Sequence, residues 1–128
     1  MPTLPQAVIE ALENRKGPVV FTTVAPDGTP NSAWVGCVDK CEEERIMLAD
    51  NYFHKTRANI LAGSRGSLLW ITEDGTSYQV KGRIEYLTEG ALYDRMREWV
   101  KDMSADLPAV AATVLHIEEA YSGAEKLL

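Results

Sequence analysis

Apolar residues recur along the chain at two spacings, one typical of helices and the other of strands. A spacing of three or four residues places side chains on one face of a helix and predicts three helices. They cover residues 3–16, 54–62 and 88–103. Alternating or continuous runs of β-branched, aromatic and other apolar residues predict six strands. These strands cover residues 19–24, 31–38, 45–49, 68–72, 78–86 and 109–117.

Polar residues and glycines mark the ends of these elements. Thr3 and Gln6 have the spacing of a capping box, and Thr88 is a candidate cap for the last helix. The Asp27-Gly28 pair predicts a hairpin turn, since glycine readily adopts the positive φ that such a turn requires. The polar stretch 39–44 predicts another turn. Strands joined by short hairpins, with helices packed outside, indicate one α+β domain over residues 1–128, built on a six-stranded antiparallel barrel.

Composition narrows the classes of partner. The 128 residues include 13 Lys and Arg against 19 Asp and Glu, for a formal charge of −6. Binding to a nucleic-acid backbone needs clustered positive charge, so we expect no nucleic-acid partner. No apolar run reaches the roughly 20 residues that span a bilayer, and the start of the chain lacks the basic segment of a secretory signal. We therefore expect a cytoplasmic protein without a membrane anchor.

Two cysteines, Cys37 and Cys41, are too few for a disulfide scaffold, and zinc needs about four ligands. Their spacing spans a predicted hairpin and differs from that of a Cys-x-x-Cys redox turn. We therefore expect incidental thiols and no metal site.

The segment from Ala49 to Asn59 carries the clearest chemical signal. It places His54, Lys55 and Arg57 in the first turn of a predicted helix, where the positive end of the helix dipole disfavours cations. A bound anion would remove this conflict, because lysine, a threonine hydroxyl and free backbone amides all bind phosphate. In the alternative interpretation, Lys55 and Arg57 simply point into solvent.

The order of elements, the Asp-Gly-Thr-Pro turn at 27–30 and the sequence His-Lys-Thr-Arg-Ala-Asn at 54–59 resemble the pyridoxamine 5′-phosphate oxidase-like family. The resemblance covers residues 4–118 and is strongest to small bacterial FMN-binding proteins. It implies the FMN-binding split-barrel fold, with FMN as the cofactor.

The resemblance also implies which residues hold the cofactor. Lys55 and Thr56 would bind the FMN phosphate with His54 beside them, and main chain at Ala49 and Asp50 would meet the cofactor. The segment Trp34-Val35-Gly36 would lie along the flavin, with Gly36 allowing close approach of the backbone. Trp34 is equally well explained as an aromatic residue of the barrel core.

Members of such a family are homodimers with FMN between the subunits. The resemblance therefore implies an oxidoreductase or electron carrier that exchanges electrons with a small molecule or a protein. No catalytic side chain is expected, because the flavin carries the chemistry. The alternatives are the same fold binding haem or a deazaflavin, or a non-catalytic cofactor-binding or sensor module.

Two departures bear on the substrate. Ser77 stands where the vitamin B6 oxidases have a cofactor-binding Gln, and the sequence after the last predicted strand offers no Arg/His segment for that vitamin. FMN binding is therefore expected without oxidation of vitamin B6. Whether the protein turns over as an enzyme stays open at this stage.

Overall fold

The computed structural model describes residues 4–42 and 44–128. In this part of the chain there are three helices, α1 (Gln6–Glu13), α2 (Lys55–Leu61) and α3 (Ala91–Met103). The strands are β1 (Val19–Val24), β2 (Pro30–Val35), β3 (Val38–Glu42), β4 (Arg45–Asp50), β5 (Gly66–Ile71), β6 (Ser77–Leu87), β7 (Ala111–Ser122) and β8 (Glu125–Lys126). None of the three described helices is long and apolar enough to cross a membrane.

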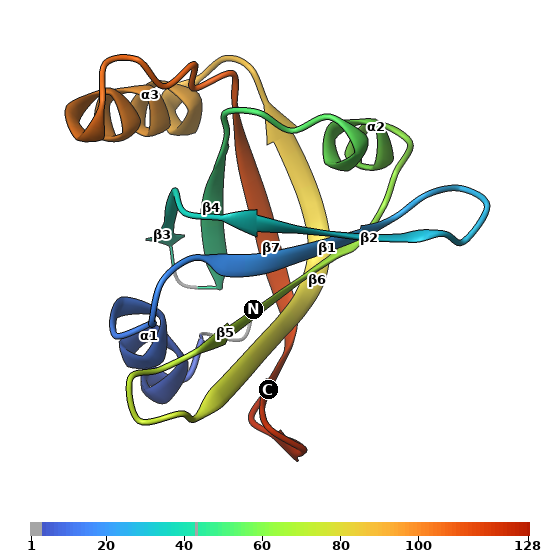
Figure 1. Cartoon of the computed structure of the whole chain (residues 1–128), viewed down its shortest axis with the longest axis vertical. Helices are drawn as coiled ribbons and strands as arrows, with labels where there is room; N and C mark the ends of the chain where they lie inside the picture. Colours follow the sequence, from blue (N-terminus) through green and yellow to red (C-terminus); the bar gives the residue numbers. More distant parts are fainter. Residues whose placement is uncertain (1–3, 43) are drawn as a thin grey trace.

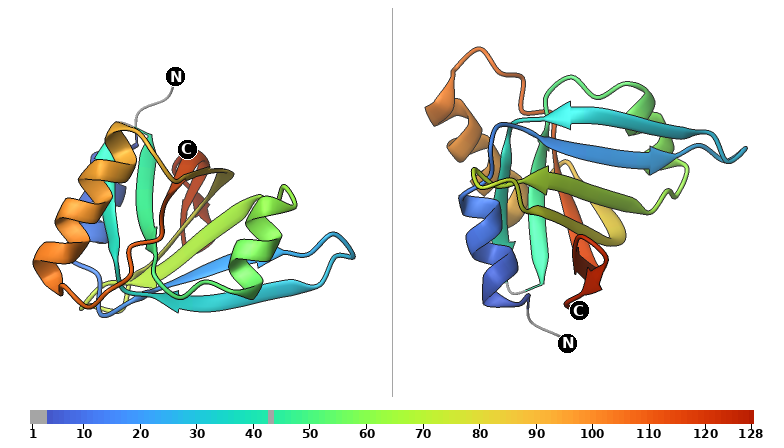
Figure 2. Two further views of the ribbon diagram at one scale, coloured as in Figure 1. Left: turned by 90° about the horizontal axis from the view of Figure 1, so that it is seen from above. Right: turned by 60° about the horizontal axis from the view of Figure 1, so that its bottom comes forward.

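The strands form one antiparallel sheet in the order β2-β1-β5-β6-β7-β4-β3, with β8 added beside β7. The sheet curls into a half-open barrel, and the long strands β6 and β7 run through its centre (Figure 1). Helix α3 lies outside β4 and β7, whereas α2 packs against β1 and β2 near the β1–β2 hairpin (Figure 2). The predicted α+β antiparallel barrel is therefore confirmed.

The strand count differs from the prediction for two reasons. The expected strand 31–38 is broken at Gly36 and Cys37, so that β2 and β3 occupy opposite edges of the sheet. The polar residues after Val38 form the edge strand β3 and not a turn, because an edge strand accommodates polar side chains. The short β8 adds the remaining strand. The backbone at Gly36 thus crosses from one edge of the barrel to the other.

Helix ends follow the sequence less closely than helix positions. The proposed cap Thr3 lies outside the described residues, and Pro5 is the N-cap of α1. Thr88 does not cap α3, which begins after Gly90 with no side-chain cap. Gly90 has a φ of +97°, a conformation that glycine adopts without strain and that redirects the chain after β6. Helix α2, with His54 as its N-cap, closely matches the predicted helix 54–62.

Two apolar clusters hold these layers together. The first fills the barrel between α1 and the inner faces of the strands, with Phe21, Ile46, Leu48, Leu68 and Leu115 fully buried. The second lies between α3 and the outer faces of β4 and β7, with Met96 and Val100 at its centre. Strand β7 contributes to both, so that residues 111–117 are buried without interruption. This part of β7 therefore has two buried faces.

Candidate functional site

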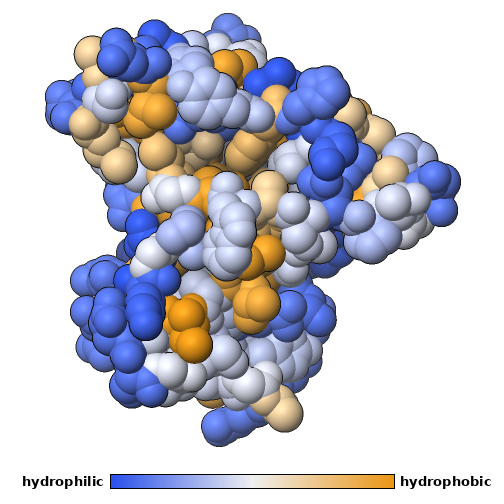
Figure 3. Space-filling view, in the orientation of Figure 1, coloured by the Kyte–Doolittle hydropathy of each residue, from blue (hydrophilic) through white to orange (hydrophobic). Residues whose placement is uncertain are grey.

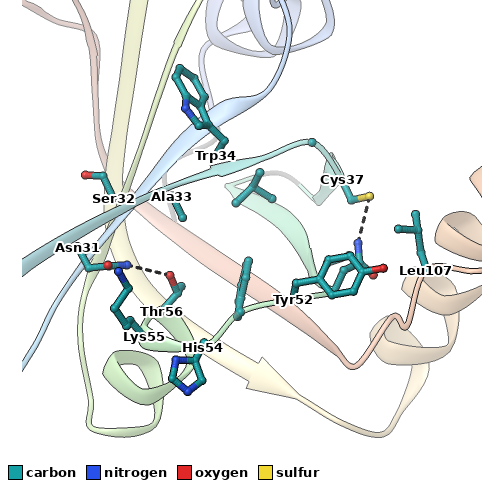
Figure 4. Close-up of a pocket in the computed structure, with 15 residues that line it drawn as sticks. Asn31, Ser32, Ala33, Trp34, Cys37, Tyr52, His54, Lys55, Thr56 and Leu107 are labelled. Atoms are coloured by element: carbon teal, nitrogen blue, oxygen red, sulfur yellow. Dashed lines mark hydrogen bonds between the residues drawn. The ribbon is translucent and has the colours of Figure 1, made fainter.

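One cavity of about 450 Å³ gathers most of the residues singled out in the sequence. It lies between β2, the end of β4, the loop that leads into α2 and the chain before β7 (Figure 4). Seven of the eight candidate cofactor residues line it: Trp34, Val35, Gly36, Ala49, His54, Lys55 and Thr56. Its volume lies within the usual range for small-molecule sites.

One end of the cavity is polar. Lys55 and Thr56 come from the first turn of α2, and Asn31 faces them from the start of β2 (Figure 4). The Asn31 side-chain amide donates a hydrogen bond to Thr56 Oγ1 at 3.0 Å, and Thr56 is only 3% exposed. Because Thr56 Oγ1 accepts this bond, its own hydrogen stays available for an acceptor in the cavity.

Asn31 escaped the sequence analysis because an Asn after a hairpin is a common turn residue. A matching contact explains why it reaches α2. Asn59, one turn further along α2, donates from its Nδ2 to Thr23 Oγ1 at 3.0 Å, and Thr23 is the cross-strand partner of Asn31. Two Asn–Thr pairs therefore attach α2 to the β1–β2 hairpin, one inside the protein and one at the cavity wall.

The middle of the cavity is bounded by the end of β2. A Cβ atom built at Gly36 would meet no atom within 4 Å, so this part of the wall is open backbone. Trp34 is 74% exposed, which excludes the interpretation that its ring belongs to the barrel core of this chain. The ring projects from the outer face of β2 (Figure 4).

Asp50 is the candidate that does not line the cavity. Its side chain is fully buried and accepts two hydrogen bonds from Arg57, one from the backbone N–H of Phe53 and one from the Tyr86 hydroxyl. Its backbone carbonyl accepts from Val110 N. Contact between its main chain and a cofactor therefore stays a prediction, whereas its side chain holds the start of the loop to α2.

The ion pair between Arg57 and Asp50 corrects the charge expected for the first turn of α2. The positive charge of Arg57 was expected to be unbalanced or solvated, but Asp50, seven residues earlier, neutralises it. The hydrogen bonds to Asp50 raise the pKa of the Arg57 guanidinium. Burial, reinforced by the hydrogen bond to Asp50, raises the pKa of Tyr86 to about 12. Among the described residues, Lys55 is thus the one lysine or arginine whose side chain lines the cavity.

The two histidines have separate environments. His54 is exposed at the polar rim of the cavity. His116 lies in β7, where its Nε2 pairs with Glu85 at 2.8 Å and its Nδ1 faces Arg83 at 3.4 Å. His116 is therefore a hydrogen-bonded strand histidine.

An apolar surface adjoins the cavity on the outer face of β1, β2 and β5. Val20 lies between Trp34 and Leu69 as cross-strand partner of both, and Ile71 extends the row along β5. Trp34, Leu69 and Ile71 are all more than 40% exposed. Figure 3 shows hydrophobic atoms gathered across the middle of this face. Trp34 belongs both to this apolar face and to the cavity wall.

A curled antiparallel sheet with a cavity beside its edge strand β2 defines a split-barrel protein. The chain belongs to the pyridoxamine 5′-phosphate oxidase family, which it matches over residues 5–122. It is 32% identical to protein MJ0282 of Methanocaldococcus jannaschii over 122 residues, which is 93% of this chain and 80% of that protein.

Solved structures share the fold. HupZ of Group A Streptococcus superimposes with a TM-score of 0.79 at 20% identity and 93% coverage of each chain. An FMN-binding protein from Syntrophomonas wolfei gives a TM-score of 0.78 at 18% identity, covering 89% of this chain and 82% of that one. HutZ, the heme storage protein from Vibrio cholerae, gives a TM-score of 0.70 at 14% identity, covering 94% and 95%. At these identities the likeness establishes the fold.

Proposed function

We propose that the chain binds FMN in the cavity beside β2 and serves as an oxidoreductase or electron carrier. The observation that carries this proposal is the meeting of seven candidate residues in one cavity of a member of this family. At its polar end, Lys55 supplies a positive charge, and Thr56 and Asn31 supply neutral donors. A lysine with hydroxyl and amide donors is a set suited to one phosphate group.

The residues of the chain would bind and orient the cofactor. Lys55 would pair with the phosphate, while the open backbone at Gly36 leaves room for a planar ring beside β2. When bound, FMN supplies hydride or single-electron transfer. No side chain of the cavity needs to act as an acid or base, and the electron donor and acceptor would be a small molecule or another protein.

The proposal includes a homodimer in the cytoplasm. The apolar face formed by Val20, Trp34, Leu69 and Ile71 is exposed and continuous with the cavity through Trp34. A second copy seated there would cover the Trp34 ring and close the cavity on the side that faces solvent. Pairing would then complete the cofactor site as well as bury apolar surface.

The test is the absorption spectrum of the purified protein, followed by titration with FMN and riboflavin after removal of any bound flavin. We expect flavin absorption in the purified protein and tighter binding of FMN than of riboflavin. A protein that binds neither compound would overturn the proposal.

Haem binding is the second candidate, favoured by the similarity to HutZ and by His54 at the cavity rim. Because His116 is engaged with Glu85 away from the cavity, His54 is the histidine placed to coordinate an iron ion there. A Soret band that appears on haem addition and is lost in His54→Ala would favour this function over flavin binding.

A further inference from the structure

The end of the cavity opposite Lys55 is built by the chain that connects α3 to β7. Leu107 comes from this connection and lines the cavity, close to Cys37 and Tyr52 (Figure 4). No local sequence pattern assigns Leu107 a role toward the cavity of its own chain. Its position depends on contacts with residues far away in the sequence.

Hydrogen bonds hold the connection in one place. Ala109 N donates to Asn51 Oδ1 at 2.9 Å, and Val110 N donates to the backbone carbonyl of Asp50 at 2.7 Å. From α3, Arg97 donates to the carbonyl of Ala109 at 2.8 Å. Lys101, also on α3, donates to the carbonyl of Leu107 itself. The loop that leads into α2 and helix α3 therefore both hold the backbone around Leu107 in place.

The backbone beside Leu107 is also strained. Ala109 is fully buried and has a φ of +47°, a conformation that residues with a Cβ atom rarely adopt. Such a conformation persists only where the surroundings determine it, and here the hydrogen bond that Ala109 N donates to Asn51 and the one that Arg97 donates to the Ala109 carbonyl do so. Leu107 is thus part of a preorganised wall.

Apart from the hydroxyl of the exposed Tyr52 at its rim, this end of the cavity is mostly apolar. Asn51 uses both ends of its amide group, since its Nδ2 donates to Cys37 Sγ at 3.4 Å and its Oδ1 accepts from Ala109. Ala49 and Leu107 add aliphatic surface. The cavity therefore has a positively charged end at Lys55 and a mostly apolar end at Leu107.

We propose that Leu107 is a specificity-determining residue that limits the size of the ring edge that the apolar end accepts. This inference rests on the proposed FMN site. In FMN, the edge without hydrogen-bonding groups is the dimethyl-substituted benzenoid edge of the isoalloxazine ring. With the phosphate at Lys55, that edge would face the wall formed by Leu107.

The test compares the affinity of FMN with that of an FMN analogue that carries a dimethylamino group in place of the 8-methyl group. Leu107→Ala opens the wall and should shift the ratio of the two dissociation constants toward the bulkier analogue by about tenfold or more, the effect typical of small changes in apolar pockets. Leu107→Trp should weaken the binding of FMN and weaken the binding of the bulkier analogue even more. Leu61→Ala, at a leucine of α2 that is 68% exposed and outside the cavity, is the matched control and should leave the ratio unchanged.

Using the ratio cancels any general loss of affinity in a less stable variant. Wild-type protein that binds FMN, together with an unchanged ratio in Leu107→Ala, would overturn the role of Leu107 and leave the proposed function standing. Wild-type protein that binds neither flavin would instead overturn the proposed function itself.

Discussion

Arg57 and Asp50 are joined by two hydrogen bonds, from Nε to Oδ2 at 2.7 Å and from Nη2 to Oδ1 at 2.9 Å. Seven residues apart, they connect the end of β4 to the first turn of α2. The loop between them contains Asn51, Tyr52, Phe53 and His54, all of which line the cavity. The pair therefore fixes both ends of the segment that forms one cavity wall.

Replacing Arg57 with alanine is expected to destabilise the fold. The change would leave the Asp50 carboxylate fully buried, with bonds from only Tyr86 and Phe53 N. Loss of one partner of a buried ion pair costs roughly 3–5 kcal/mol, and the lower value is expected here because the Arg57 side chain is 33% exposed. Urea unfolding followed by circular dichroism measures the difference. Arg65→Ala, which removes an exposed pair with Glu118, should change the free energy of unfolding by about 1 kcal/mol or less.

Tyr86 should make stability depend on alkaline pH. Its pKa is raised from 10.0 to about 12, first by burial and then by its hydrogen bond to Asp50. A pKa that is higher in the folded state contributes stability below the unfolded value, and this contribution is lost as pH rises toward the folded value. Between pH 10 and 12, the free energy of unfolding should therefore fall more steeply for wild type than for Tyr86→Phe. Parallel curves for the two proteins would mean that Tyr86 does not titrate abnormally.

Lys55→Ala should weaken FMN much more than riboflavin, since riboflavin lacks the phosphate that Lys55 is proposed to bind. A charged hydrogen bond to phosphate contributes about 1.5–3 kcal/mol, which corresponds to roughly a tenfold to hundredfold change in affinity. Isothermal titration calorimetry with FMN and with riboflavin gives, for each flavin, the ratio of the dissociation constants of Lys55→Ala and wild type. Lys126→Ala, at an exposed lysine of β8, serves as a control with the same loss of charge. Equal losses for both flavins would assign Lys55 a structural role.

The sequence predicted the parts of this protein that depend on local patterns. Helix α2, the buried strand β7 and the nearness of Lys55 and Thr56 to each other follow from residues close in the chain. Other features depend on contacts across the fold. Arg57 was assigned an unbalanced charge because its partner Asp50 precedes the helix, and Asn31 has no signal until β2 and α2 are brought together.

The break at Gly36 in the predicted strand 31–38 likewise could not be predicted from local sequence pattern. The apolar run 33–38, which contains Gly36, looks like part of one strand, although the barrel needs the chain to cross between its two edges at this point. Leu107 likewise acquires its place only when Asn51 and α3 hold the connection before β7. Local pattern therefore identified the phosphate-binding candidates, and the resemblance supplied Ala49 and the segment Trp34-Val35-Gly36. Tertiary contacts were needed to place Asn31 and Leu107.

The proposed homodimer can be tested at Leu69 without touching the cavity. Leu69 is 42% exposed on the apolar face and pairs with Val20, but it does not line the cavity beside β2. In Leu69→Glu, association would bury an unpaired carboxylate, which costs several kcal/mol, so the dimer dissociation constant should rise by about a hundredfold or more. Sedimentation velocity measures this change, and Leu61→Glu on the exposed side of α2 should leave association unchanged.

If pairing completes the cofactor site, FMN affinity should fall in Leu69→Glu as the dimer dissociates, and should recover at protein concentrations that restore the dimer. A Leu69→Glu protein that associates like wild type would show that this apolar face is not the interface.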